Sequence, residues 1–173
     1  MFSFFIGNDD PRREFIKRKY TKKYKNSSET EYLVSDFLQD KLKQYKDVDN
    51  IYYYLIWIVD ETLVVKMFVE PELFEKALHV QKILAEQDLG CEIVDVWRNG
   101  EENFIVSKYG GSSLENECNF EKSEEIPSEV HVITQKLFDL GLRMDDFHSG
   151  NFVKDKEGKI RIIDYESVSK IPP

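Results

Sequence analysis

The residues best suited to chemistry lie between positions 146 and 166. Asp146 and Asn151 are five positions apart with His148 between them, and Asp164 and Glu166 follow on the far side of a short polar stretch. Oxygen donors of this kind can hold a divalent cation, and a carboxylate can orient a hydroxyl group. Taken singly, Asp146 and Asn151 would be ordinary turn residues and Asp164 the cap of a strand end. Only the ordered set indicates a functional site.

This segment resembles the catalytic and metal-binding loops of the protein-kinase-like superfamily. In that superfamily the first loop has the pattern D-x-[KH]-x-x-N, and a short hairpin delivers a second metal-binding aspartate. The resemblance implies that Asp146 is the catalytic base and that His148 lies near the transferred phosphate. It further implies that Asn151 and Asp164 bind Mg²⁺, which would accompany ATP. The fold class implied is α+β, a truncated bilobal kinase-like fold with an antiparallel N-lobe sheet, a helix C and a reduced helical C-lobe.

Upstream features occur in the order that the resemblance requires. Lys66 interrupts the apolar run 62–69 and resembles the strand lysine that pairs with the nucleotide's phosphates. Without the rest of the pattern, a lysine there would more simply extend its ammonium to solvent. The next helix would be helix C, and Glu75 is the first choice as the partner of Lys66, with Glu72 and Glu86 as alternatives.

The segment 106–114 contains Gly110-Gly111 and resembles the hinge between kinase lobes, whose backbone would meet adenine. Lys108 and Tyr109 are therefore the predicted nucleotide-binding residues of the hinge. The helix that begins near Pro127 would be helix E.

Four departures from the pattern bear on function. The usual His-Arg before the catalytic aspartate is replaced by Met144-Asp145, so the loop must be supported differently. No Gly-rich loop precedes Lys66, so the amides that would cradle phosphates are not identifiable. Glu166 replaces the glycine of D-F-G, as in choline- and aminoglycoside-kinase-like enzymes, where it would assist the metal or hold the loop. Only residues 167–173 follow, so no activation segment or substrate lobe is expected.

Hydrophobic patterning predicts the elements that position these residues. Helices are expected where apolar residues recur every three or four positions behind a capping signal, and strands where β-branched and aromatic residues gather. The expected helices are 28–45, 70–87 and 127–140, and the expected strands are 51–59, 62–69, 92–97, 103–109, 151–154 and 159–164.

Composition narrows the class of protein. The chain has 173 residues, a net charge of −9 and 41% hydrophobic residues, which suits one domain or two small lobes. The acidic balance makes nucleic acid an unlikely partner. Cys91 and Cys118 have no metal-ligand spacing and are expected to be reduced thiols. No apolar run is long enough to cross a membrane, so a cytoplasmic location is the default expectation.

The segment 11–25 is strongly basic, with eight basic residues against one acidic residue. It could be an arm for an acidic partner, or a solvated face over Phe15, Tyr20 and Tyr24. Both readings remain open from sequence.

These inferences combine into one hypothesis and two alternatives. The predicted division is a basic segment and amphipathic helix over 1–50, a kinase-like N-lobe over 51–109, and a hinge with a truncated C-lobe over 110–173. The predicted function is a minimal, atypical kinase that transfers the ATP γ-phosphate to a protein hydroxyl, acting on a protein substrate or with a regulatory partner. The alternatives are a pseudokinase that serves as a binding module, and a small-molecule kinase of the aminoglycoside or choline type.

Overall fold

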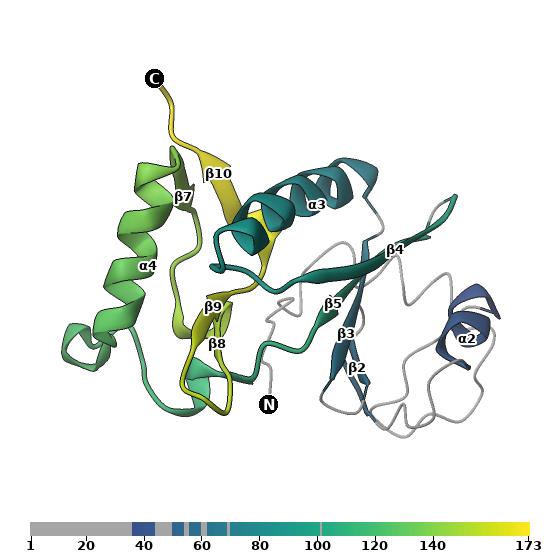
Figure 1. Cartoon of the computed structure of the whole chain (residues 1–173), viewed down its shortest axis with the longest axis horizontal. Coiled ribbons are helices and arrows are strands. Elements are labelled where there is room, and N and C mark those ends of the chain that lie inside the picture. Colours follow the sequence, from purple (N-terminus) through teal and green to yellow (C-terminus); the bar gives the residue numbers. More distant parts are fainter. Residues whose placement is uncertain (1–35, 44–49, 54–55, 60–61, 69, 101) are drawn as a thin grey trace.

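The computed structural model describes residues 36–43, 50–53, 56–59, 62–68, 70–100 and 102–173 (Figure 1). The predicted basic segment 11–25 lies outside the described residues, as do both ends of the predicted helix 28–45. Within that helix the structure has α2 (Asp36–Leu42). Leu38 and Leu42 of α2 are buried, which agrees with the predicted amphipathic pattern.

A five-stranded antiparallel sheet forms the first half of the described chain. Its strands stand in the order β1-β2-β3-β5-β4. Their bounds are β1 (Asn50–Tyr53), β2 (Ile56–Val59), β3 (Leu63–Phe68), β4 (Ile93–Asn99) and β5 (Glu102–Lys108). The predictions for β3, β4 and β5 are confirmed with small shifts at their ends.

The single strand predicted over 51–59 is wrong, because this run forms two strands that pair with each other. Asn50 of β1 lies opposite Ile58 of β2, and Ile51 lies opposite Trp57. The run contains no Gly, Pro, Asn or Asp after Asn50. Since those residues are the usual signals of a chain reversal, the pattern showed strand propensity but not the turn.

Helix α3 (Pro71–Glu86) follows β3 and has Pro71 at its first turn, where a missing N–H costs nothing. Its inner face packs on the sheet and also on the segment that follows β9 (Ile160–Ile162). Helix α4 (Ser128–Asp139) lies beside β7 (Leu142–Met144), on the left of Figure 1. Both helices were predicted, and both carry an apolar face at helical spacing.

The C-terminal half consists of short elements. Three strands, β6 (Ser112–Ser113), β8 (Phe152–Lys154) and β9 (Ile160–Ile162), form one antiparallel sheet, and β7 (Leu142–Met144) pairs with β10 (Val168–Lys170). Four 3₁₀ helices complete the described part: η1 (Leu114–Asn116), η2 (Ser123–Glu125), η3 (Ser149–Asn151) and η4 (Tyr165–Ser167). Strands β7 and β10 were not predicted. They are as short as β8 and β9, but no turn signal like Glu157-Gly158 joins them, because they are far apart in the sequence.

One hydrophobic core joins the two halves. Phe74 and Leu84 of α3, Leu137 of α4 and Ile162 of β9 are almost completely buried within it. The architecture is therefore α+β with antiparallel sheets and few helices. None of the described helices combines the length and apolar character needed to cross a lipid bilayer.

Candidate active site

Lys66 enters the site from the middle of the five-stranded sheet. It lies opposite Ile56 of β2 and Ile105 of β5. Because side chains alternate between the faces of a strand, Lys66 shares its face with Val64 and Phe68, and all three line one pocket. Its side chain is 15% exposed. A charge held among apolar neighbours is stable only with an anion close by.

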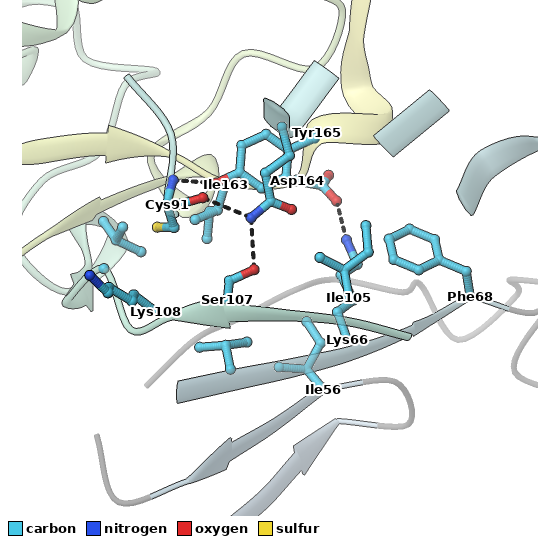
Figure 2. A pocket seen from close by; sticks show the side chains of 14 residues that line it. Ile56, Lys66, Phe68, Cys91, Ile105, Ser107, Lys108, Ile163, Asp164 and Tyr165 are labelled. Atoms are coloured by element: carbon cyan, nitrogen blue, oxygen red, sulfur yellow. Dashed lines mark hydrogen bonds and ion pairs between the residues drawn. The ribbon is translucent and has the colours of Figure 1, made fainter. Parts of the chain in front are cut away.

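Two carboxylates from the C-terminal segment supply that anion. The Lys66 Nζ lies 3.0 Å from Oδ1 of Asp164 and 2.5 Å from Oε1 of Glu166, and Figure 2 shows the first of these contacts. The other carboxylate oxygen of Glu166, Oε2, is buried and has no hydrogen-bond partner among the described residues. The contacts join the central strand of the sheet to the loop that follows β9.

The three charges control one another's protonation. Burial would lower the pKa of Lys66, but Glu166 and Asp164 outweigh burial and raise it. Burial would likewise raise the pKa of Asp164, but the adjacent ammonium holds that pKa well below its usual range. The pKa of Glu166 is raised, chiefly by burial and further by the neighbouring Asp164. At neutral pH, Lys66 is therefore charged and Asp164 is ionised.

The backbone at Asp164 has a left-handed conformation, with φ 64° and ψ 55°. This conformation is uncommon for a residue with a side chain and costs about 1 kcal/mol or more. The Ser167 hydroxyl donates a hydrogen bond of 2.7 Å to Oδ2 of Asp164 and holds the carboxylate in place. Such backbone outliers are common where a loop must present a functional side chain.

An apolar pocket lies beside Lys66, between the sheet and the β8–β9 hairpin (Figure 2). It encloses about 540 Å³ of empty space when the part open to solvent is included. Its walls come from β2, β3, β5, α3 and the hairpin. The lining residues are Ile56, Val64, Lys66, Phe68, Gln81, Cys91, Ile105, Ser107, Lys108, Gly110, Val153, Ile163, Asp164 and Tyr165.

Sequence reasoning missed two residues that organise this pocket, Gln81 and Tyr165. The Gln81 amide is buried and donates to the Cys91 carbonyl at 2.9 Å and to the Ser107 hydroxyl at 2.7 Å. The Tyr165 hydroxyl accepts the Cys91 N–H at 2.8 Å. Gln81 did carry a signal, because it occupies an inward position of α3 four residues after Ala77.

The predicted catalytic loop is more exposed. The Asp146 side chain is 67% exposed, and its Oδ2 lies 3.2 Å from Nε2 of His148. The other ring nitrogen of His148 accepts the Gly150 N–H at 3.1 Å. Asn151 is buried, and its side-chain amide donates to the Asp146 carbonyl at 2.8 Å. Asn151 thus fixes the backbone at Asp146 and leaves the Asp146 carboxylate exposed.

The β8–β9 hairpin brings the two predicted metal ligands near each other. Asn151 directly precedes β8 and Asp164 follows β9, and Phe152 pairs with Ile162 across the hairpin. The Ile163 N–H donates to the Asn151 carbonyl at 2.9 Å. Among the described residues there is no group of three or more His, Cys, Asp or Glu residues placed to hold a metal ion, so an ion here would need further oxygen ligands.

The two predicted hinge residues have different positions. Lys108 lines the pocket, although its ammonium is paired with Glu92 at 2.5 Å in an exposed position. Tyr109 packs against the cluster of Cys91, Val153 and Ile163 and is not among the lining residues. The amides of Lys108 and Tyr109 already donate to the backbone at 2.9 and 2.8 Å. Adenine contacts through these two amides would require those bonds to break.

Glu75 does not have the predicted contact with Lys66. Its carboxylate is exposed and pairs with Arg98 at 2.5 Å. The alternatives Glu72 and Glu86 are exposed as well. The first-choice partner is wrong because Glu75 is on the outer face of α3, and the carboxylate beside Lys66 comes from Glu166 instead.

A second cavity lies beside the predicted catalytic loop, residues 146–151. It encloses about 1000 Å³ of empty space, open solvent included. The residues 115–121 form one side and Asp146 to Ser149 the other. Phe120 and Phe147 contribute aromatic surface, with ring centroids 5.1 Å apart. Asp146 is therefore at the edge of a space that a second molecule can enter.

Comparisons with known proteins found structural similarity only. Neither a family model nor a curated protein matches the sequence. The structure is similar to that of the bifunctional kinase-methyltransferase WbdD, with a TM-score of 0.48 and 19% identity over 68% of this chain and 30% of that chain. A structure of WbdD with the kinase inhibitor LY294002 gives a TM-score of 0.46 and 18% identity over 67% of this chain and 31% of that chain. The chain spans about a third of the length of these proteins.

Proposed function

We propose that this protein is an atypical kinase that uses ATP and Mg²⁺ to phosphorylate a protein hydroxyl. The observation that carries the proposal is the Lys66 ammonium, held between the carboxylates of Asp164 and Glu166 beside an apolar pocket. A largely enclosed cation, a pair of carboxylates and an apolar cavity are the three environments that phosphate, metal and nucleobase respectively require.

The apolar pocket beside Lys66 would bind the nucleotide. Val64, Ile105 and Ile163 provide apolar walls for a base, and Lys66 is close enough to the carboxylates to contact phosphates that share a metal with them. The raised pKa of Lys66 keeps the ammonium charged at neutral pH. This residue would bind the phosphates and orient them toward Asp164.

The residues around Asp164 fit a magnesium ion bound together with phosphates. Mg²⁺ typically keeps several waters and takes one or two carboxylates, and Asp164, Glu166 and the amide oxygen of Asn151 are the ligands on offer. The buried, unpartnered Oε2 of Glu166 supports this, because an orphaned carboxylate oxygen is costly without a cation or donor. When bound, the ion would neutralise charge on the transferred phosphate.

The acceptor would approach from the second cavity. Asp146 lines that cavity and is exposed, so its carboxylate can orient an incoming hydroxyl and accept its proton. His148, 3.2 Å from Asp146, would stabilise that carboxylate and contact the phosphate. A cavity open to solvent admits a side chain on a protein surface as well as a free molecule.

A kinase-shaped binding module is the second candidate function. The observation in its favour is that the amides of Lys108 and Tyr109 are engaged within the chain, at the place where a hinge would contact adenine. This candidate predicts that binding to a partner does not depend on Asp146.

The proposal can be tested with ATP labelled at the γ-phosphate. The purified chain is incubated with Mg²⁺ and a mixture of generic protein acceptors, and labelled phosphoprotein is measured with and without EDTA. We expect metal-dependent labelling that Asp146→Ala reduces by about 10²-fold or more. Metal-dependent ATP binding without any transfer would favour the binding module. Labelling that is unchanged in Asp146→Ala would contradict the proposed role of that residue.

A further inference from the structure

Lys76 is a charged residue on α3 that no step of the proposed reaction uses. Its ammonium donates to the backbone carbonyl of Glu166 at 2.6 Å and to the hydroxyl of Ser169 at 3.1 Å. The side chain is half-buried between the helix and the C-terminal segment. Both acceptors lie in the stretch that directly follows Asp164.

Glu166 contacts both Lys76 and Lys66. Its backbone carbonyl is held by Lys76 and its carboxylate by Lys66, at 2.5 Å. Helix α3 is therefore connected to the buried lysine through a single residue of the loop. Since α3 and η4 pack against each other, a shift of the helix would move Glu166 and, with it, the ammonium of Lys66.

Lys76 is also linked, through Ser169, to Asp145 just before the predicted catalytic loop. Ser169, the second acceptor of Lys76, donates a hydrogen bond to the carboxylate of Asp145, and the Asp145 N–H donates to the Ser167 carbonyl at 2.7 Å. Asp145 directly precedes Asp146. The support that the missing His-Arg pair would provide is thus built from Asp145 and Ser169, at the point where Lys76 docks.

No glutamate of α3 makes a described contact with Lys66. Glu75, the first choice from sequence, is bound to Arg98 on the outer face of the helix. Glu166 therefore replaces a helix carboxylate beside Lys66, and Lys76 ties Glu166 back to the helix. The arrangement keeps the coupling between helix and lysine and moves the carboxylate from the helix to the loop.

We propose that Lys76 is a positioning residue that couples α3 to the site by holding Glu166 in place beside Lys66. This inference rests on the proposed function for its meaning in catalysis, but the coupling itself is a property of the chain. Removing the Lys76 ammonium frees the Glu166 carbonyl and Ser169, so the loop loses its anchor on the helix. The Lys66 ammonium then becomes more exposed.

The test measures the exposure of Lys66 without any nucleotide. The full chain is treated briefly with an acetylating reagent, and the rate of Lys66 modification is followed by peptide mass spectrometry. We expect Lys76→Met to raise this rate about tenfold, which corresponds to a coupling of about 1.4 kcal/mol. Lys76→Arg, which keeps a donor and a charge, is expected to restore most of the protection. Lys82→Met is the matched control, because Lys82 is exposed on the same helix.

Ser169→Ala keeps the inference testable if Lys76→Met does not fold. It removes one acceptor of Lys76 and is expected to raise the rate of Lys66 acetylation by a smaller factor than Lys76→Met does. An unchanged Lys66 rate in folded Lys76→Met or in Ser169→Ala, or an equal rise in Lys82→Met, would overturn the proposal.

A parallel titration with MgATP separates the two claims. If the wild-type chain binds MgATP, Lys76→Met should weaken the affinity about tenfold and Lys76→Arg much less. If the wild-type chain does not bind MgATP, the proposed function fails, while the acetylation rates still decide the coupling.

Discussion

Asp164 and Asp146 are the two carboxylates on which the proposed reaction depends most, and they lie in opposite surroundings. The Asp164 side chain is 17% exposed and is held by Lys66 and Ser167. The Asp146 side chain is 67% exposed, and its Oδ2 lies 3.2 Å from Nε2 of His148. The surroundings of Asp164, here called the inner region, are held by ionic and hydrogen-bond contacts within the chain. The surroundings of Asp146, the outer region, are open to solvent, where an acceptor could approach. This contrast suggests that nucleotide binding and acceptor recognition can be disrupted separately.

The largest expected effect comes from removing each carboxylate in turn. Asp164→Ala should reduce phosphoryl transfer below detection, because it removes the main predicted metal ligand and one of the two carboxylates beside Lys66. Asp146→Ala should slow transfer by about 10²-fold or more and leave ATP affinity unchanged. Initial rates with labelled ATP measure both. Substantial turnover in Asp164→Ala would erase the distinction between the two regions.

A second comparison concerns stability. Lys66→Met leaves two buried carboxylates without their cation and should lower the free energy of unfolding by about 3 kcal/mol. Lys108→Met breaks an ion pair in which both side chains are at least 60% exposed. This substitution should change the free energy of unfolding by about 0.5 kcal/mol or less. Urea unfolding at neutral pH measures both variants. Equal effects would mean that the Lys66 cluster is not a buried charge centre.

The inner region is also tightly packed at the predicted hinge. Gly111 has φ +113°, and a Cβ there would lie 1.9 Å from the Lys154 carbonyl oxygen. Gly111→Ala should therefore destabilise the fold by about 2–3 kcal/mol. Gly158 also has positive φ, but a Cβ there meets nothing within 4 Å, so Gly158→Ala should cost only about 1 kcal/mol. Thermal unfolding of the two variants would detect the difference, and equal melting temperatures would contradict it.

The smallest expected effect concerns the hairpin between Asn151 and Asp164. Burial would raise the pKa of Asp155, but hydrogen bonds from Arg161 and from the Lys159 and Glu157 amides outweigh burial and lower it. Because the pKa of Asp155 is lower in the folded state, its ionised carboxylate stabilises the fold at pH values above the unfolded-state pKa of about 3.9. That stabilisation is lost as the pH falls through the folded-state pKa. Asp155→Asn should cost about 1 kcal/mol at pH 7 and should flatten the loss of stability as the pH falls below the unfolded-state pKa. Unfolding curves across that range test it, and parallel curves for both proteins would refute it.

The sequence predicted the long helices and strands better than it predicted which strands pair and which carboxylate contacts Lys66. Helices α3 and α4 were expected because each carries an apolar pattern at helical spacing, and strand β3 because it lies in a continuous apolar run interrupted only by Lys66. The reversal between β1 and β2 was missed because the run 51–59 contains no turn former. Strands β7 and β10 were missed because they are far apart in the sequence and no turn signal joins them. The neighbourhood of Lys66 shows the same limit. The need for an anion beside a lysine in an apolar strand was visible, but the candidates were all sought on the following helix, as Glu75, Glu72 or Glu86. All three are exposed on that helix, and the carboxylate of Glu166, far along the chain, contacts Lys66 together with Asp164.

The central claim is tested most directly by calorimetric titration of ATP into the protein with and without Mg²⁺, repeated on Asp164→Asn. The substitution keeps the shape of the side chain and removes the charge, so it isolates the proposed metal contact. We predict that ATP binds with Mg²⁺, and that Asp164→Asn loses most of the Mg²⁺-dependent affinity while remaining folded. Absence of ATP binding to the folded wild-type protein, or equal affinity in Asp164→Asn, would contradict the assignment of this site to a nucleotide and its metal.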